Sequence, residues 1–364
     1  MNPAAEKHVF SALDAGRGVA ALMVIVHHLP EALRGHAFES ANLAVDFFFG
    51  LSGFVLAHAY LDKLTAGRMS VREFMVVRLI RLYPLYLFSL ILLLVWLAGM
   101  VIDSRPIPWS IFALAGKLPF ALVMLPSPSL DFSAYLYPFN IAAWSIAFEL
   151  AVNLVFAIYA RQMQRPAVRW AVIAVSGVLL VVQLLVKDDL GGSSWNTIVM
   201  GVPRVCFSFF LGMQLYEWHC RRTPIRRTMG GATSLAALAV LFGLLVAPAH
   251  LWLELGAIFL VFPLLIVVLG AAELPHGRVG DALQRLGVLS YAVYVLHGPL
   301  LRAWLYLYPA SVLDAKVVIG TTLLLVTVVA VSWAADRWFD RPIRSKLQLR
   351  LRQRASRAPA AAQR

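Results

Sequence analysis

The chain has 364 residues, of which 60% are hydrophobic and 14% are charged, and its mean hydropathy is +0.76. This composition excludes an ordinary soluble domain, and the long continuous apolar runs exclude the alternating short strands of a transmembrane β-barrel. The formal net charge of +13 would suit a nucleic-acid partner in a soluble protein, but here most Lys and Arg residues lie between apolar runs. They are interpreted as orienting loops, and no nucleic-acid partner is expected.

The apolar runs predict an all-α, polytopic membrane helix bundle of about ten transmembrane helices, because ~20 apolar residues cross a bilayer. The predicted spans are residues 11–29, 43–60, 82–102, 141–160, 168–186, 197–217, 231–248, 251–271, 288–308 and 312–335. The shorter apolar piece 109–125 is interrupted by Lys117 and Pro119. It is predicted to be an interfacial or re-entrant helix.

The sequence divides into an N-terminal lead (1–10), a membrane domain (11–340) and a basic C-terminal tail (341–364) whose composition predicts disorder. Ten spans place both termini on one side of the membrane. The loops on the terminal side contain most of the Lys and Arg residues, whereas the opposite loops contain Arg34, Arg105, Lys117 and Lys187. The positive-inside rule therefore predicts a cell (inner, cytoplasmic) membrane protein with both termini in the cytoplasm.

The first predicted span contains Arg17 near its start and His28 at its far end. Eleven residues correspond to roughly three helical turns, so the two side chains share a face about 16 Å apart along the axis. Ionisable groups inside a membrane helix are usually functional. His28 suits a general base because imidazole titrates near neutral pH. The alternative is a histidine that is satisfied by a backbone carbonyl or lies at the membrane interface.

Other ionisable residues are predicted to converge on the same pocket from different helices. Asp46 or Glu149 is expected to orient His28, by the logic of acid–base–orienter triads. Asp14 is expected to pair with Arg17 one turn away. Arg204 and Arg302 lie deeper than anchoring residues need to be, so they are expected to pair with acids or to contact substrate. Ser52, by contrast, is interpreted as a small packing residue.

Arg78 and Arg81 are three residues apart, just before Pro84, and lie on one helical face. Guanidinium groups suit phosphate because they bind bidentately and stay charged. Positive-inside anchoring is the alternative explanation for each arginine taken alone. With Arg17 at the same membrane level, the three arginines favour a phosphate-bearing cytosolic co-substrate.

Five segments together resemble the acyltransferase 3 family of integral membrane acyltransferases. They are Leu13-Asp14-Ala15-Gly16-Arg17 followed by His28, Val45-Asp46-Phe47-Phe48-Phe49-Gly50, Arg78-Leu79-Ile80-Arg81-Leu82-Tyr83-Pro84, Trp144-Ser145-Ile146-Ala147-Phe148-Glu149, and Leu289-Ser290-Tyr291 with His297. This resemblance covers most of the chain. It implies transfer of an acyl group, with acetyl expected, from cytoplasmic acyl-CoA to a hydroxyl of a carbohydrate or other cell-envelope glycan.

The resemblance also suggests roles for individual residues. Arg17, Arg78 and Arg81 would hold the phosphates of CoA, and His28 would deprotonate the acceptor hydroxyl. Trp144, Ser145, Tyr291 and His297 are further pocket candidates, and Ser145 and Tyr291 are candidate oxyanion donors. Acyl-CoA is expected as a co-substrate, with no tightly bound cofactor and no metal. Direct transfer and a transient acyl-enzyme intermediate both remain open.

A transporter or flippase of a polar or lipid-linked substrate is the rival class, because buried charges also suit a substrate path. The sequence shows no inverted repeat and no pair of Gly/Pro-broken helices in matching positions. Release of CoA from acetyl-CoA separates the two classes, because transport does not require it.

Overall fold

The computed structural model describes residues 10–34, 36–106, 109–131, 134–187, 189–220, 229–308 and 317–361. Every regular element in these ranges is a helix, which confirms the predicted all-α class. Seven helical segments are long and apolar enough to cross a membrane: Glu39–Thr65, Val71–Ile102, Pro166–Lys187, Ile198–Trp218, Leu251–Ala271, Arg278–Leu307 and Val318–Leu351. The protein is therefore a multi-pass helical membrane protein.

Several of these segments combine more than one helical element. The second predicted span corresponds to η1 (Glu39–Leu43), α3 (Ala44–Leu56), η2 (Ala57–Leu61) and α4 (Asp62–Thr65). The other elements within the long segments are α5 (Val71–Ile102), α9 (Pro166–Lys187), η3 (Ile198–Met200), α10 (Gly201–Cys220), α12 (Leu251–Gly256), η4 (Ala257–Val261), α13 (Phe262–Ala271) and α14 (Arg278–Leu307). The short helices are α2 (Glu31–Arg34) and α8 (Ala160–Met163).

The predicted count of ten spans is not confirmed. Three predicted spans correspond to shorter helices: α1 (Ser11–His27), α7 (Ala143–Ile158) and α11 (Gly231–Val246), with 17, 16 and 16 residues. At about 1.5 Å per residue, such helices fall short of the ~30 Å hydrocarbon core. The piece predicted as interfacial or re-entrant contains the still shorter α6 (Ile111–Leu122).

Two predicted helix starts were too late. We placed the third span at residue 82, but α5 begins at Val71, where Ser70 and Glu73 form a capping box. Pro84 lies inside this helix and does not end it, as neighbouring segments permit in membrane helices. Likewise, α14 begins at Arg278, although residue 288 was the predicted start. Arg78 and Arg81 therefore lie within α5, in agreement with their predicted position on one helical face.

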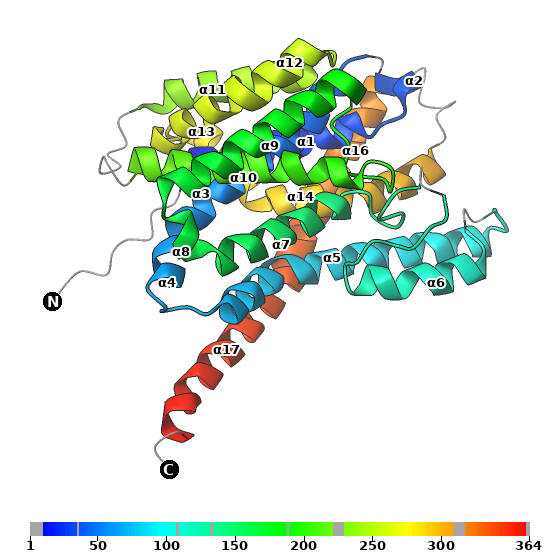
Figure 1. Cartoon of the computed structure of the whole chain (residues 1–364). Coiled ribbons are helices and arrows are strands. Elements are labelled where there is room, and N and C mark those ends of the chain that lie inside the picture. Colours follow the sequence, from blue (N-terminus) through cyan, green and yellow to red (C-terminus); the bar gives the residue numbers. More distant parts are fainter. Residues whose placement is uncertain are drawn as a thin grey trace.

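Residues 341–361, which composition predicts to be disordered, are helical in the structure. Helix α16 (Val317–Ala335) continues through η6 (Asp336–Asp340) into α17 (Arg341–Ala361), which points away from the bundle (Figure 1). Ion pairs between Arg344 and Asp340 (2.9 Å) and between Arg341 and Asp336 (2.6 Å) link the first turn of α17 to η6. Amino-acid composition does not reveal these local ion pairs, so it could not predict this helix. Residues 1–9 and 362–364, at the ends of the predicted lead and tail, lie outside the described residues.

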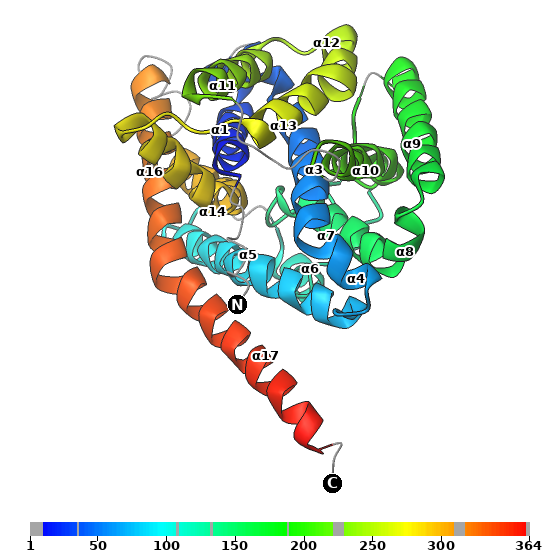
Figure 2. The ribbon, with the colours of Figure 1, turned by 90° about the vertical axis from the view of Figure 1, so that its left-hand side faces the viewer.

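Helices α1, α3, α5, α7 and α14 surround the centre of the bundle when it is viewed from the side shown in Figure 2. Helix α1 packs most extensively on α14, and α3 packs on α10. All the residues that we consider below as the centre of the site come from these helices or from α10. The fold thus brings together residues that are far apart in the sequence, such as Arg17 of α1 and Tyr291 of α14.

Glycines allow the two main helix pairs to approach closely. A Cβ atom on Gly18 of α1 would lie 2.7 Å from Cγ and 2.9 Å from the backbone carbon of Leu286, and one on Gly287 of α14 would lie 2.5 Å from the backbone of Asp14. At the other crossing, a Cβ on Gly212 of α10 would lie 1.9 Å from the carbonyl oxygen of Gly50 in α3. Small residues at such crossings let membrane helices pack by direct backbone contact.

The α3–α10 crossing gives a test of this packing. We expect Gly212→Ala to lower the midpoint of thermal unfolding in detergent, because the new methyl group overlaps backbone, which typically costs about 1–3 kcal/mol. The matched control is Gly243→Ala in α11, where a Cβ would meet nothing within 4 Å. Helix propensity favours Ala over Gly by about 1 kcal/mol at both positions, so the control should be unchanged or more stable. Equal midpoints for the two variants would contradict the packing argument.

Candidate active site

Two arginines at one end of the bundle lack a strong acidic partner. Arg17 of α1 pairs with Asp14 at 3.5 Å, which confirms the predicted pair, but both side chains are about one-third exposed, at 32% and 34%. Arg81 of α5 lies with its guanidinium carbon 5.4 Å from the ring centre of Tyr291. Among the described residues, no carboxylate forms an ion pair with Arg81. Positive charge at this end of the bundle is therefore available to an anion.

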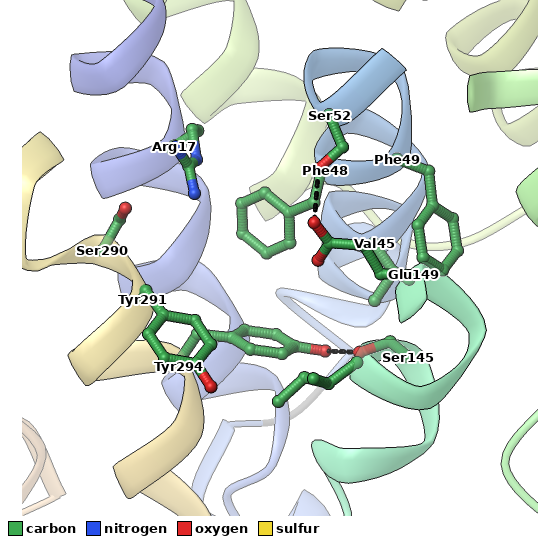
Figure 3. A pocket seen from close by; sticks show the side chains of 11 residues that line it. Arg17, Val45, Phe48, Phe49, Ser52, Ser145, Glu149, Ser290, Tyr291 and Tyr294 are labelled. Carbon is green, nitrogen blue, oxygen red and sulfur yellow. Dashed lines mark hydrogen bonds between the residues drawn. The ribbon is translucent and has the colours of Figure 1, made fainter. Parts of the chain in front are cut away.

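Arg78 instead has a close partner within the protein. Its Nη2 donates to Oε1 of Glu149 at 2.7 Å, and the Ser52 hydroxyl donates to the same oxygen at 2.8 Å (Figure 3 shows the second bond). These contacts link α5, α3 and α7. Glu149 therefore orients Arg78, and the expectation that it orients His28 is not met in the structure. Ser52, which we interpreted as a packing residue, belongs to this polar cluster.

Asp46, the other expected partner of His28, is bound to Arg204 of α10. Arg204 donates from Nε to both carboxylate oxygens at 3.0 Å and from Nη2 to Oδ2 at 2.8 Å. The two side chains are only 3% and 1% exposed. Arg204 also donates to the carbonyls of Asn42 and Gly191, and its guanidinium lies 5.4 Å from the ring centre of Trp144. The predicted pairing of Arg204 with an acid is confirmed, and that acid is Asp46.

His28 is oriented by backbone instead of by a carboxylate. Its Nδ1 lies 2.8 Å from the carbonyl oxygen of Val24. A carbonyl only accepts hydrogen bonds, so this contact places the proton on Nδ1 and leaves Nε2 as the basic nitrogen. The contact also matches the alternative of a histidine satisfied by a backbone carbonyl, but the ring lines a cavity. Neither Asp46 nor Glu149 bonds to His28 within the described part of the chain.

A second histidine packs directly against His28. The ring centres of His28 and His297 of α14 are 4.9 Å apart. His297 is fully buried, and its Nδ1 lies 2.6 Å from the carbonyl oxygen of Tyr294. By the same reasoning Nδ1 carries the proton, and Nε2 of His297 has no hydrogen-bond partner among the described residues. His27 also packs against His28, with ring centres 5.2 Å apart, and its Nδ1 lies 2.9 Å from the carbonyl oxygen of Phe38.

Two cavities lie on either side of Tyr294. The first, here called the Arg17 cavity, measures about 40 Å³ and is lined by Arg17, Val45, Phe48, Phe49, Ser52, Ser145, Ile146, Glu149, Ser290, Tyr291 and Tyr294 (Figure 3). The second, here called the His28 cavity, measures about 270 Å³ and includes His27, His28, Asn42, Val45, Tyr135, Trp144, Asp189, Arg204 and Tyr294 in its lining. Val45 and Tyr294 line both cavities, so the two spaces meet at these side chains.

The remaining predicted pocket residues, Ser145, Tyr291 and Arg302, each bind a different partner. Ser145 reaches Tyr294, with the two hydroxyl oxygens 2.6 Å apart. Tyr291 lines the Arg17 cavity, but its hydroxyl donates to the Leu82 carbonyl, which argues against its predicted role as an oxyanion donor. Arg302 donates to the carbonyl of Pro138 at 2.7 Å, so its expected acidic partner is replaced by backbone. Its guanidinium also lies 5.4 Å from the ring centre of Trp109.

These helices therefore build two adjoining cavities, one lined by Arg17 and the other lined by His28. The described residues contain no group of three or more His, Cys, Asp or Glu side chains placed to hold a metal ion. Comparison with known proteins now decides the family. The family model for the acyltransferase domain of acyltransferase 3 proteins matches residues 10–337.

This chain belongs to the acyltransferase 3 family. It is 26% identical over 292 residues to Acyltransferase MdmB of Streptomyces mycarofaciens, an alignment that covers 73% of this chain and 70% of that protein. It is 42% identical over 183 residues to Protein 2 in picA locus of Rhizobium radiobacter, covering 48% of this chain and 93% of that protein. No solved structure matches significantly. The predicted resemblance is confirmed, and an acyltransferase activity follows from family membership.

Within this acyltransferase, Tyr294 and Ser52 are the site residues that sequence reasoning missed. The signal for Tyr294 was present, because it lies between Tyr291 and His297 on the same helix. Its importance depends on where α14 packs, which the sequence does not give. The signal for Ser52 was weak, since a serine between glycines is more often a packing residue in a membrane helix.

The buried pair of Asp46 and Arg204 can be tested by stability. We expect Asp46→Ala to lower the free energy of unfolding by about 3–5 kcal/mol, because Arg204 then remains buried without its counter-charge. Adding Arg204→Met to this variant should recover part of the loss by removing the unpaired charge. Thermal or denaturant unfolding in detergent measures both variants. A double variant less stable than Asp46→Ala would show that the isolated charge is not the cause.

Proposed function

We propose that this protein is a membrane-embedded O-acyltransferase that moves an acyl group, with acetyl as the expected case, from cytoplasmic acyl-CoA to a hydroxyl of a carbohydrate or cell-envelope glycan. The observation that carries the proposal is the meeting of two cavities at Val45 and Tyr294. One lies beside cations that suit a phosphate-bearing donor, and the other contains a histidine with a free basic nitrogen. A reaction between two substrates that enter from opposite ends fits this arrangement.

The donor side is assigned by asking whether an acidic side chain neutralises each arginine. Arg17 and Arg81 have little or no acidic compensation in the described residues, so they are the better candidates for the phosphates of CoA. Arg78 is neutralised by Glu149 and would act mainly by holding the helices around the donor path. The excess of Lys and Arg in the loops on the terminal side supports a cytoplasmic location for this end and for both termini.

The pantetheine arm would need to widen the Arg17 cavity. At about 40 Å³, that cavity has space for very few atoms, so lining side chains must move when the thioester enters. Phe48 and Tyr294, whose rings pack edge to face at 5.2 Å, are placed to do so. Exclusion of bulk water in the resting state would limit wasteful hydrolysis of the donor.

The lining of the His28 cavity is suited to binding a hydroxylated acceptor. The His28 cavity combines the aromatic faces of Trp144 and Tyr135 with polar groups that include Asp189 and Ser193. Aromatic rings offer flat apolar faces, while carboxylate and hydroxyl groups exchange hydrogen bonds with hydroxyls. These features support a carbohydrate acceptor. Asp46 and Arg204 would shape the cavity wall through their mutual pair.

In the proposed reaction, Nε2 of His28 takes the proton of the acceptor hydroxyl as that oxygen attacks the carbonyl carbon of the thioester. The C–S bond then breaks, and the departing CoA thiolate takes the proton from His28. Val24 keeps the imidazole in the required tautomer throughout. Positioning both substrates in one enclosed passage supplies much of the rate. Direct transfer needs no acyl-enzyme intermediate, and we adopt it as the simpler scheme.

The role of His28 is tested by thiol release from acetyl-CoA by the purified protein in detergent. We expect His28→Ala to lower kcat by about 10²–10⁴-fold, the usual contribution of general base catalysis. His36→Ala is the control, because His36 is an exposed histidine (79%) beside Glu39 and lines neither cavity. Retention of the full rate by His28→Ala would overturn the assignment.

The donor site is tested by comparing two arginines of the same helix. Arg81→Gln should raise the KM for acetyl-CoA about 10-fold or more with a smaller effect on kcat, because a phosphate contact acts equally in the ground and transition states. Arg72→Gln, at an exposed position nearer the start of α5, controls for loss of charge. An unchanged KM in Arg81→Gln would remove Arg81 from the donor site.

A further inference from the structure

Tyr294 occupies the junction of the two cavities. Its side chain is 7% exposed, and it is one of two residues that line both spaces. The other is Val45, which has no polar side-chain atom. Tyr294 therefore supplies the one polar side-chain group that the linings of the two cavities share. Figure 3 shows the Tyr294 ring reaching across the cavity toward Ser145 of α7.

The hydrogen bonds around this phenol identify Tyr294 as the donor to Ser145. Ser145 Oγ lies 3.0 Å from the carbonyl oxygen of Ala142, to which only the serine can donate. With the serine proton used there, the 2.6 Å contact between the two hydroxyls has Tyr294 as donor and Ser145 as acceptor. The neighbouring Tyr291 differs, because its hydroxyl donates to a backbone carbonyl, that of Leu82. Tyr294 is thus held by a neutral side-chain acceptor.

Tyr294 is also held in a fixed relation to the base. Its carbonyl accepts a hydrogen bond from Nδ1 of His297, and the His297 ring packs against His28. His297 is fully buried and its Nδ1 contact is 2.6 Å long. The centre of the His297 ring also lies 5.8 Å from that of the Tyr294 ring, so His297 contacts the aromatic rings of both Tyr294 and His28.

We infer that Tyr294 is a catalytic residue that donates its phenolic O–H to the thioester oxygen as negative charge develops there. The inference rests on the proposed acyl transfer. A hydrogen bond to an oxyanion is charge-assisted and about twice as strong as a neutral one. The developing negative charge would therefore draw the phenolic O–H of Tyr294 away from Ser145. The small Arg17 cavity must widen when acyl-CoA enters, and this movement would allow the Tyr294 hydroxyl to leave Ser145.

The acceptor oxygen forms a bond to the thioester carbon, and its proton moves to Nε2 of His28. The carbonyl π pair moves onto oxygen, where Tyr294 stabilises it by a hydrogen bond and keeps its own proton. Collapse of the tetrahedral intermediate reforms the C=O bond and breaks the C–S bond. The CoA thiolate receives the proton from His28, and Tyr294 returns to Ser145.

The experiment measures thiol release from acetyl-CoA by full-length protein in detergent, with water as acceptor. Tyr294→Phe should lower kcat by about 10²–10³-fold, the usual effect of losing one oxyanion donor, and leave KM nearly unchanged. Tyr86→Phe is the matched control, because Tyr86 is buried in α5, donates to the Ala121 carbonyl and lines neither cavity. Thermal unfolding midpoints of the two variants show whether a loss of rate reflects a loss of fold.

The Ser145→Ala variant shows whether Tyr294 or Ser145 donates the hydrogen bond to the thioester oxygen. If Tyr294 is the donor, Ser145 only holds the resting phenol, and Ser145→Ala should lose at least 10-fold less rate than Tyr294→Phe. A larger loss in Ser145→Ala would assign the oxyanion contact to Ser145 and overturn the inference. Faster thiol release by Tyr294→Phe would also overturn it, because the phenol would then act as a barrier to water.

The inclusion of His28→Ala separates this inference from the proposed function. A rate that depends on His28 but not on Tyr294 rejects only the role of Tyr294. A rate that is independent of His28 rejects the proposed reaction, and the inference is rejected with it. Loss of rate in both variants, with Tyr86→Phe at the wild-type rate, supports both.

Discussion

The close approach of α1 and α14 determines how the residues of the candidate site are placed. Gly18 and Gly287 have no Cβ, so the backbones of the two helices meet directly. This contact brings His28, at the end of α1, against His297 of α14, and it brings Arg17 to the same cavity as Tyr291 and Tyr294. The side chains that α1 and α14 contribute to the two cavities are thus placed by one interface. A side chain at either glycine would separate them, whatever the state of the individual site residues.

Charge pairing in a low-dielectric interior divides the ionisable residues into two groups. Asp46 with Arg204 and Glu149 with Arg78 are pairs between helices, and their cost of burial is offset only by their mutual contact. They hold the walls of the passage. Arg17 and Arg81 retain charge that the described residues do not fully balance, which is a cost unless a ligand offsets it. Incomplete pairing is therefore the better guide to the donor site than the number of arginines in a motif.

Side-chain arrangements within a single helix could be predicted from the sequence. The helical spacing placed Arg17 and His28 on one face of the first span, and the Asp14–Arg17 pair followed from one turn of separation. The all-α membrane class followed from hydropathy. Partners on different helices could not be predicted, because the carboxylates of Asp46 and Glu149 were equally plausible neighbours of His28 until the packing of α10 and α5 was known. The helical tail was missed because its first turn is stabilised by ion pairs to η6, which overall composition does not reveal.

Orientation of His28 by a backbone carbonyl has a consequence for the reaction. A carboxylate partner would stabilise the imidazolium but would itself have to be buried as a charge, at a cost of several kcal/mol. The Val24 carbonyl fixes the same tautomer without adding a charge. No carboxylate of the described residues then stabilises the protonated ring, and His297 beside it offers a neutral nitrogen. The proton taken from the acceptor would thus be held only briefly before it passes to the CoA thiolate. This favours direct transfer between two substrates bound together over a long-lived charged intermediate.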